Sequence, residues 1–305
     1  MKKFLTLAAL MLATPIITQH NEALAVTLGP LPKDVIYSSD RTFDRPNIFF
    51  NNPTDTIQIS GQTVLGNEST YEARIYFPRG IGTGGFVFNE WTGGYEDKGL
   101  AAGLNALIGI NIPFYPGIPL ASLTTLVSDT WHHIAFVQGG GSQRLYLDGQ
   151  MVGTRPATGD IWDSDGGSFI GALFRDGGTA SSFIGHLDTL RISNVARYSS
   201  NSFEAPTGDL ASDANTQILY NFNLENYYQQ DGFTWASDLS GNGRNGRFGT
   251  GFAGATSPSV IVPVEPSEPV PEPTTLLGTL AFGAVISRWR VKRKQQQKSL
   301  NSIVS

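Results

Sequence analysis

Residues 129–152 read DTWHHIAFVQGGGSQRLYLDGQMV, and this stretch decides the fold class. It opens with a mostly apolar run over 131–137, interrupted by two histidines, which is typical of a central β-strand. The glycine triplet at 139–141 predicts a hairpin loop before the next strand. Asp148-Gly149 separates two further short runs, and this pair favours a type I′ turn because both positions need positive φ. The stretch therefore predicts antiparallel strands joined by tight turns.

The sequence on both sides repeats this pattern of short runs separated by Gly, Asn, Asp and Pro. In the run over 70–77, Tyr71, Ala73, Ile75 and Phe77 alternate with polar or amphipathic residues, as one buried face of a strand requires. Almost no helical periodicity lies between residues 26 and 254. Further strands are predicted at 85–89, 107–112, 131–137, 144–147, 150–152, 168–173, 183–192 and 217–224. We therefore predict an all-β chain: two antiparallel sheets packed as a single sandwich.

Composition narrows the functions that this sandwich can have. The chain has 305 residues, 40% of them hydrophobic and 15% charged, and no cysteine, which excludes disulfides and cysteine chemistry. The net charge of −5 is unevenly spread, because residues 26–273 hold 13 Lys and Arg against 25 Asp and Glu. Such an acidic domain repels polyanions such as nucleic acid unless cations bridge them, so a neutral partner, or an acidic one bridged by calcium, is favoured over nucleic acid.

The N-terminus predicts export. Met1-Lys2-Lys3 is basic, residues 4–17 are apolar, and Ala23-Leu24-Ala25 has the small residues of a cleavage site. The apolar run is shorter than the ~20 residues of a membrane-spanning helix. Residues 1–25 are therefore predicted to be a signal peptide, with a buried N-terminal helix as the alternative, and residues 26–254 to be the folded domain.

The C-terminus has three features in order. A Pro/Glu/Ser/Val-rich stretch, predicted to be a linker over 255–270, leads to Pro271-Glu272-Pro273. A short apolar helix is predicted over 274–287, followed by a basic cluster that includes Arg288 and Arg290. Residues 271–305 resemble the PEP-CTERM sorting signal of Gram-negative-type bacteria, cyanobacteria included. That resemblance implies processing by an exosortase and a transient stay in the membrane; a permanent single-span anchor is the alternative.

Four motifs of the central region, taken in order, resemble laminin-G-like, concanavalin A-like jelly rolls. Residues 129–149 are similar to the signature W-H-H-[VI]-A … L-Y-[VL]-D-G, and residues 183–198 to F-x-G-x-[IL]-D-x-[LV]-R-I-S-x-x-A-R. Residues 219–223 and 238–246 are similar to the closing motifs of the family. The resemblance covers residues 45–250 and implies a two-sheet jelly roll, one face of which often binds ligands.

Three local expectations follow from this architecture. Trp131 begins a central strand, so its large ring is expected to pack between the sheets. Asp188 and Arg191 are three positions apart and would point to opposite faces of a regular strand. Residues 238–243 are predicted to form a turn, because Asp238 can accept hydrogen bonds from the backbone that follows it and the glycines can adopt positive φ.

The sequence gives little support to a hydrolase, whether of the Ser-His-Asp type or a glycoside hydrolase. No G-x-S-x-G elbow accompanies His132, His133 and His186, so these histidines are predicted to be structural. Glycoside hydrolysis needs two facing carboxylates about 5–9 Å apart. The nearest cluster is Glu90 with Glu96-Asp97, and it lacks the alternating spacing that would place carboxylates on one face.

Two candidate ligand sites remain. Asp163 and Asp165 alternate in a glycine-rich turn and could hold Ca²⁺, although a solvated turn is the alternative. Trp91, Tyr95, Tyr115 and Trp162 lie in or beside polar loops and could form aromatic platforms for a sugar. We predict an exported, non-enzymatic domain for glycan binding or adhesion at the cell surface or in extracellular matrix. A structural matrix protein without a specific ligand and a glycan-active hydrolase are the alternatives.

Overall fold

The computed structural model describes residues 35–40, 42–61, 63–81, 84–91, 97–112, 119–157, 167–175, 178–249 and 254–264. Within these ranges the regular structure is β-strand apart from a 3-10 turn at Leu224–Asn226. Residues up to Val264 belong to one unit, and a second unit, Glu265–Ser305, falls outside the described residues. No helix among the described residues is long and apolar enough to cross a membrane, and the predicted apolar helix over 274–287 lies beyond them.

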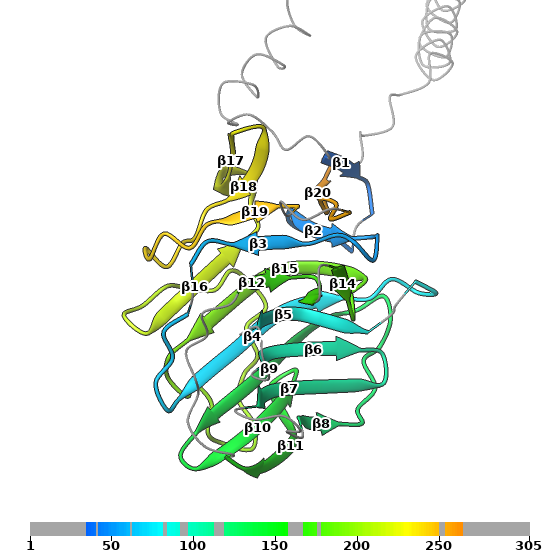
Figure 1. Ribbon diagram of the computed structural model, residues 1–305. Coiled ribbons are helices and arrows are strands. Elements are labelled where there is room, and N and C mark those ends of the chain that lie inside the picture. Colours follow the sequence, from blue (N-terminus) through cyan, green and yellow to red (C-terminus); the bar gives the residue numbers. More distant parts are fainter. Residues whose placement is uncertain are drawn as a thin grey trace, which may run out of the picture. The chain divides into compact units, whose positions relative to one another are not determined.

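Two nine-stranded sheets make up the fold, together with a small β13–β14 ribbon (Leu173–Arg175 and Gly178–Ala180) (Figure 1). The first sheet has the strand order β1-β20-β2-β15-β4-β9-β10-β11, with β16 also paired to β15. Its strands are β1 (Val35–Ser38), β2 (Asn47–Phe50), β4 (Ser69–Tyr76), β9 (Trp131–Gly139), β10 (Ser142–Leu147), β11 (Gln150–Pro156), β15 (Gly185–Ser193), β16 (Thr216–Asn221) and β20 (Ser259–Pro263).

The second sheet has the order β17-β18-β19-β3-β12-β5-β6-β7-β8. Its strands are β3 (Ile57–Ile59), β5 (Gly85–Trp91), β6 (Asp97–Gly103), β7 (Ala106–Ile112), β8 (Leu120–Ser122), β12 (Ser168–Ile170), β17 (Tyr227–Gln230), β18 (Phe233–Ala236) and β19 (Gly246–Phe248). In Figure 1, β17–β19, β1 and β20 lie at one end of the sandwich and β8 and β11 at the other. The antiparallel jelly-roll prediction is confirmed, with β1–β20 as a parallel exception.

The main core lies between the sheets and is built by period-2 alternation. Tyr71, Ala73, Ile75 and Phe77 are fully buried in it, as the sequence predicts for this face. They meet apolar residues of the opposite sheet, and Tyr71 lies against Phe88 with ring centroids 5.7 Å apart. Burying a large apolar side chain stabilises the fold by about 1.5–3 kcal/mol, so this layer is the main source of stability.

Backbone geometry matches the turn predictions. Asp148 and Gly149 have φ of 49° and 75°, as a type I′ turn requires. A Cβ on Gly149 would stand 2.1 Å from the carbonyl oxygen of Phe203, so glycine is also needed for close approach. The loop at 238–245 is held by Asp238, whose carboxylate accepts backbone N–H bonds from Leu219, Ser240 and Arg244.

Some strand predictions need correction. The predicted strand over 168–173 is split at Gly171, whose φ of 91° ends β12 before β13 begins. The predicted linker over 255–270 contains β20, which pairs with both β1 and β2. The sandwich therefore extends to Val264, because an apolar Val-Ile-Val run completes the first sheet beyond the turn-rich residues that precede it.

The predicted position of Trp131 is wrong. Ile134 and Phe136 of β9 point into the core, so Trp131 falls on the outer face by alternation. There it packs with Phe43 and Tyr76 in a separate apolar cluster, and the guanidinium of Arg74 lies 4.5 Å from its ring centroid. The strand begins with tryptophan, yet register rather than size decides which way the ring points.

The expectation for Asp188 and Arg191 also fails, because a bulge in β15 shifts its register against β4 between Leu187 and Thr189. Asp188 bonds Arg74 at 2.6 Å, and Arg191 bonds Glu72 at 2.8 Å. Since Glu72 and Arg74 share one face of β4, both β15 side chains point to that outer face. They form ion pairs with their neighbours on β4 rather than with each other.

Glu72 is the centre of a buried ionic cluster on this outer face, with no exposed surface. Its carboxylate accepts hydrogen bonds from Arg191 and from Tyr198, and it lies 3.1 Å from Nε2 of His133. Burial raises the pKa of Glu72, but the hydrogen bond with His133 and the charge of Arg191 outweigh it and lower the pKa below its ordinary value. The cluster therefore holds an ionised carboxylate.

Replacing Glu72 by Gln tests how much this cluster contributes. The change leaves the Arg191 guanidinium buried without its counter-charge, so we expect the free energy of unfolding to fall by about 3–5 kcal/mol. The matched control is Asp44→Asn, which removes a carboxylate 62% exposed in a 3.6 Å pair with Arg45 and should cost less than ~1 kcal/mol. Equal losses in urea denaturation of the two variants would contradict a central role for Glu72.

Candidate functional site

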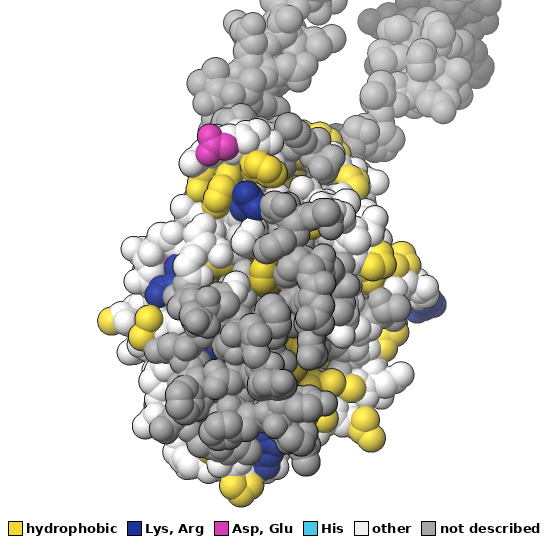
Figure 2. All heavy atoms as spheres, viewed as in Figure 1, with side chains coloured by type: hydrophobic (Ala, Val, Ile, Leu, Met, Phe, Trp, Pro, Cys, Tyr) yellow, Lys and Arg dark blue, Asp and Glu magenta, His cyan; other side chains and the backbone are white. Residues whose placement is uncertain are grey.

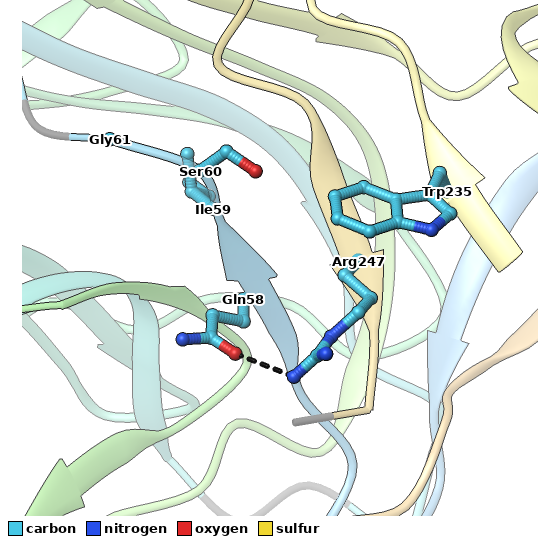
Figure 3. Close-up of a pocket in the computed structure, with 6 residues that line it drawn as sticks. All are labelled: Gln58, Ile59, Ser60, Gly61, Trp235 and Arg247. Atoms are coloured by element: carbon cyan, nitrogen blue, oxygen red, sulfur yellow. Dashed lines mark hydrogen bonds between the residues drawn. The ribbon is translucent and has the colours of Figure 1, made fainter. Parts of the chain in front are cut away.

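A pocket of aromatic and polar side chains lies on the outer face of the second sheet, at the end formed by β17–β19. Its volume is about 370 Å³, and it is lined by Gln58, Ile59, Ser60, Gly61, Trp235 and Arg247. Figure 3 shows Trp235 and Arg247 projecting from β18 and β19 beside the β3 residues. Pockets that hold small molecules begin at about 300 Å³, so this one can take a sugar unit.

Strand register brings these side chains together. Tyr228 pairs with Trp235, Trp235 with Arg247, and Arg247 with Gln58 across four neighbouring strands. Directly paired residues project from the same face of a sheet, so the four form one transverse row. Figure 2 shows hydrophobic side chains at this end of the face, with a basic group on one side of them and an acidic group on the other.

The orientation of the Trp235 indole is fixed by its neighbours. Its Nε1–H donates to the carbonyl oxygen of Gln230 at 3.2 Å, and its ring stacks with Tyr228 at an interplanar angle of 14°. With the indole N–H already bonded, the rest of the ring is an apolar surface that lines the pocket. A flat apolar surface held in place before binding reduces the ordering cost of complex formation.

Arg247 supplies the charge of the pocket. Its Nη2 donates to Oε1 of Gln58 at 2.9 Å, and its guanidinium carbon lies 4.7 Å from the ring centroid of Phe233. Phe233 is 38% exposed and lies two positions before Trp235 on the same strand. The site therefore combines a stacking surface, a cation and a planar amide within a few side chains.

This site was not predicted from the sequence. Residues 227–235 read YYQQDGFTW, in which Asp231-Gly232 separates two aromatic-containing runs just as Asp148-Gly149 does in the stretch first quoted. Asp231 and Gly232 have φ of 52° and 79°, so the hairpin signal was present and correct. No sequence signal, however, placed Gln58 and Ser60 beside this hairpin.

The site residues that the sequence predicted lie largely outside the described residues. Tyr95, Tyr115 and Trp162 are among them, as are Asp163 and Asp165 and the sorting residues Pro271, Glu272, Pro273, Arg288 and Arg290. Trp91 is described at its backbone, as the last residue of β5. In the part of the chain that is described, no group of three or more His, Asp or Glu side chains could hold a metal ion. Calcium binding at Asp163 and Asp165 stays a prediction.

Glu90, the carboxylate considered for hydrolysis, is buried in the sandwich with no exposed surface. Thr63 donates its hydroxyl hydrogen to Oε2 of Glu90, and the Lys98 ammonium lies 3.9 Å from the same oxygen. Glu90, Thr63 and Lys98 thus form a set of buried polar side chains beside the core, where a polysaccharide chain cannot reach the Glu90 carboxylate.

The three histidines considered for catalysis have structural partners. Nδ1 of His132 lies 2.7 Å from Asp148, which ties the type I′ turn to β9. His133 bonds Glu72, and the ring of His186 stacks on Phe49 with centroids 4.2 Å apart while Nδ1 lies 2.8 Å from Asn47 Oδ1. The prediction of structural roles agrees with this geometry.

Comparison with known proteins identifies the fold independently. Residues 51–201 match the family described as the Concanavalin A-like lectin/glucanases superfamily. The matched region contains the β9–β11 hairpins and β15 but ends before the β17–β19 residues of the pocket. No curated protein matches the chain.

Among solved structures, a Bacteroides ovatus protein to which carbohydrate binding is ascribed has a TM-score of 0.54 and 17% identity. The match covers 73% of this chain and 61% of that protein, so this chain spans under two thirds of its length. The CBM40 of a Ruminococcus gnavus sialidase bound to α2,3-sialyllactose has a TM-score of 0.41 and 10% identity, covering 52% of this chain and 94% of the other. Domains LG4-5 of the mouse laminin α1 chain have a TM-score of 0.40 and 11% identity, and the match covers 53% of this chain and 48% of the other. At 17% identity, the likeness to the Bacteroides ovatus protein shows a shared fold and nothing more.

The pKa values of His186 and His132 are shifted in opposite directions, so we expect opposite effects of the two residues on how the free energy of unfolding depends on pH. Burial lowers the pKa of His186 to about 3. The stabilisation by neutral His186 is therefore fully present above pH 6.5. It is lost at about 1.4 kcal/mol per pH unit as the pH falls towards 3, because the unfolded chain takes up a proton that the folded protein does not. For His132, burial lowers the pKa, but the hydrogen bond and charge of Asp148 outweigh burial and raise it above 6.5. The stabilisation by His132 is therefore complete below 6.5 and is lost as the pH rises through its folded pKa.

Denaturation of His186→Gln between pH 7 and 4 checks this assignment. Glutamine can still donate a hydrogen bond to Asn47, but it takes up no proton, so we expect the acid-side slope of the unfolding free energy to become shallower. His132→Gln is the control and should change the slope above 6.5 instead. An unchanged acid slope in His186→Gln would show that the folded protein accepts a charged His186.

Proposed function

We propose that this protein is a non-enzymatic carbohydrate-binding or adhesion domain that holds glycan at the pocket of Trp235, Arg247 and Gln58. The observation that carries the proposal is the oriented indole of Trp235 beside a cation and an amide, over a pocket of about 370 Å³. The family match of residues 51–201 and the likeness to a Bacteroides ovatus protein with an ascribed carbohydrate-binding role support the same class.

The chemistry of the pocket fits a sugar ring. A pyranose has an apolar patch of C–H groups on its face and hydroxyls around its edge, so it needs an aromatic surface with hydrogen-bonding groups beside it. Trp235 offers the surface, while Gln58, Ser60 and Arg247 offer polar groups along one side. The hydroxyl of Ser60 can both donate and accept, which suits a sugar hydroxyl.

A binding role is favoured over hydrolysis by the placement of the carboxylates. Hydrolysis needs two carboxyl groups facing the glycosidic bond about 5–9 Å apart. None of the six residues that line the pocket is acidic, and Glu90 is buried with Thr63 and Lys98. A structural matrix protein with no specific ligand is the second candidate, and it predicts that loss of Trp235 changes no binding.

Export and sorting belong to the same proposal. The signal peptide at 1–25 and the PEP-CTERM-like tail at 271–305 would deliver the domain to the cell envelope, surface or extracellular matrix. An exosortase would act on the tail, and residues 274–287 would contact the membrane transiently. These segments fall outside the described residues, and the sequence features at the two ends support this part of the proposal.

Trp235→Ala tests the binding site. A central aromatic side chain in a binding site commonly contributes about 2 kcal/mol or more, so we expect the affinity for a bound glycan to fall by at least about 10-fold. The measurement is a glycan array with the purified full-length protein, followed by calorimetry on the glycan that binds best. Tyr37→Ala is the control, because Tyr37 is 60% exposed and lies on β1 of the other sheet.

The results separate the candidate functions. Binding that is lost in Trp235→Ala and kept in Tyr37→Ala supports the pocket. Binding unchanged in both variants places the glycan elsewhere, and Trp91, Tyr95, Tyr115 and Trp162 are then the residues to replace. No binding to any glycan, with or without calcium, leaves the structural matrix protein.

Mass spectrometry of the protein recovered from its producing cells tests the two termini. We expect a mature N-terminus at Val26 and a C-terminus near Pro273, because the small residues at 23–25 and the Pro-Glu-Pro motif are the predicted processing sites. An intact Ser305 would rule out processing of the tail and favour a retained anchor.

A further inference from the structure

We infer that the Trp235 pocket selects sugars that carry a carboxylate, that is, uronic-acid residues of an acidic glycan. The inference rests on the proposed function and adds the class of ligand to it. It departs from the expectation drawn from net charge, which favoured a neutral partner or an acidic one bridged by calcium. In the pocket, a guanidinium can bind the carboxylate directly.

Arg247 differs from three other arginines of the domain in having no carboxylate partner among the described residues. Arg74, Arg191 and Arg197 each lie within 3 Å of a carboxylate oxygen, on Asp188, Glu72 and Asp213. Among the described residues, no carboxylate lies within 4 Å of the Arg247 guanidinium, whose contacts there are the Gln58 oxygen and the Phe233 ring. A cation of this kind lining a pocket is available to an anionic ligand.

The polar groups of the pocket are mainly donors. A guanidinium can only donate, so Gln58 must present its oxygen to Arg247, which leaves the amide NH₂ of Gln58 as a donor. Arg247 has five N–H donors and uses one of them in this bond. An arrangement rich in donors and short of acceptors suits a carboxylate, which accepts through both of its oxygens.

The guanidinium is held in place before a ligand arrives. Gln58 bonds one edge of it, and the Phe233 ring lies against its carbon at 4.7 Å. Planar arginine groups fixed in this way bind carboxylates in a paired geometry that lysine cannot reproduce. The indole of Trp235, paired with Arg247 across the strands, would stack on the sugar ring that bears the carboxylate.

The acidic charge of the rest of the domain sharpens this selectivity. Residues 26–273 hold 25 acidic against 13 basic residues, so a polyanion gains nothing from the general field of the protein. Attraction is then limited to the pocket, at a range comparable to the ~8–10 Å screening length of physiological salt. Binding should require a carboxylate at a fixed place beside a sugar ring rather than a high density of negative charge.

Calorimetry with two forms of one polymer tests the inference. Polygalacturonate and its fully methyl-esterified form share the same sugar and linkage but differ in the carboxylate, and EDTA removes any calcium bridge. For the full-length protein we expect the acid form to bind at least about 10-fold more tightly. Arg247→Gln should remove this difference, with about a 10- to 100-fold loss for the acid form and little change for the ester.

Control variants separate charge from geometry. Arg79→Gln removes the same unit of charge from a side chain that is 83% exposed, on the loop between β4 and β5 and not among the pocket residues, and should leave both affinities unchanged. Arg247→Lys keeps the charge without the planar fork and should recover only part of the selectivity. Thermal denaturation of each variant ensures that a lost interaction is not lost folding.

Each other outcome has a definite meaning. Equal binding of the acid and ester forms overturns the selectivity and leaves glycan binding intact, provided that Trp235→Ala weakens both. Dextran sulfate bound as tightly as polygalacturonate overturns recognition of the carboxylate, because any dense negative charge would then suffice. If neither polymer nor any neutral glycan binds, the proposed function itself fails.

Discussion

A buried carboxylate, Glu72, links three segments of the first sheet and its covering loop that lie up to 126 positions away from it in sequence. It stands on the outer face of β4 and bonds Arg191 of β15, Tyr198 of the following loop and His133 of β9. A carboxylate buried without such partners would cost several kcal/mol, so the charge is tolerable only when all three segments are in place. The fold therefore has one correct register for these strands, enforced by electrostatics as well as by apolar packing.

The same cluster accounts for two polar residues of the signature motifs, because His133 and Arg191 both bond Glu72. The loop that carries Tyr198 has a second role. The residues between β15 and β16 cross the outer face of the first sheet, where Tyr198 and Phe203 stack with ring centroids 3.6 Å apart and cover Tyr146. Hydrogen bonds from Met151 to Asn201 and from Phe203 to Gly149 fix this covering segment to the type I′ hairpin. This segment thus covers part of the outer face of the first sheet, and the proposed pocket lies on the outer face of the second sheet.

Much of this architecture was predictable, and the failures have specific causes. Alternation assigned the buried face of β4 correctly, and Asp148-Gly149 predicted its turn from φ preferences alone. Trp131 was assigned to the core from its size, whereas its register places it outside. Asp188 and Arg191 were assigned to opposite faces because a bulge, which depends on pairing with β4, leaves no mark in the strand's own sequence.

The sequence by itself determined the all-β class, the hairpins and the alternation of core residues, because these depend on side-chain periodicity and local backbone preferences over a few residues. Only the tertiary structure decided the site. Gln58 and Arg247 are 189 positions apart, and they meet because β3 and β19 are neighbours in the second sheet. Strand order is a property of the whole folded chain, since each strand finds its neighbour by burying a shared face, and no local pattern encodes which strand that will be.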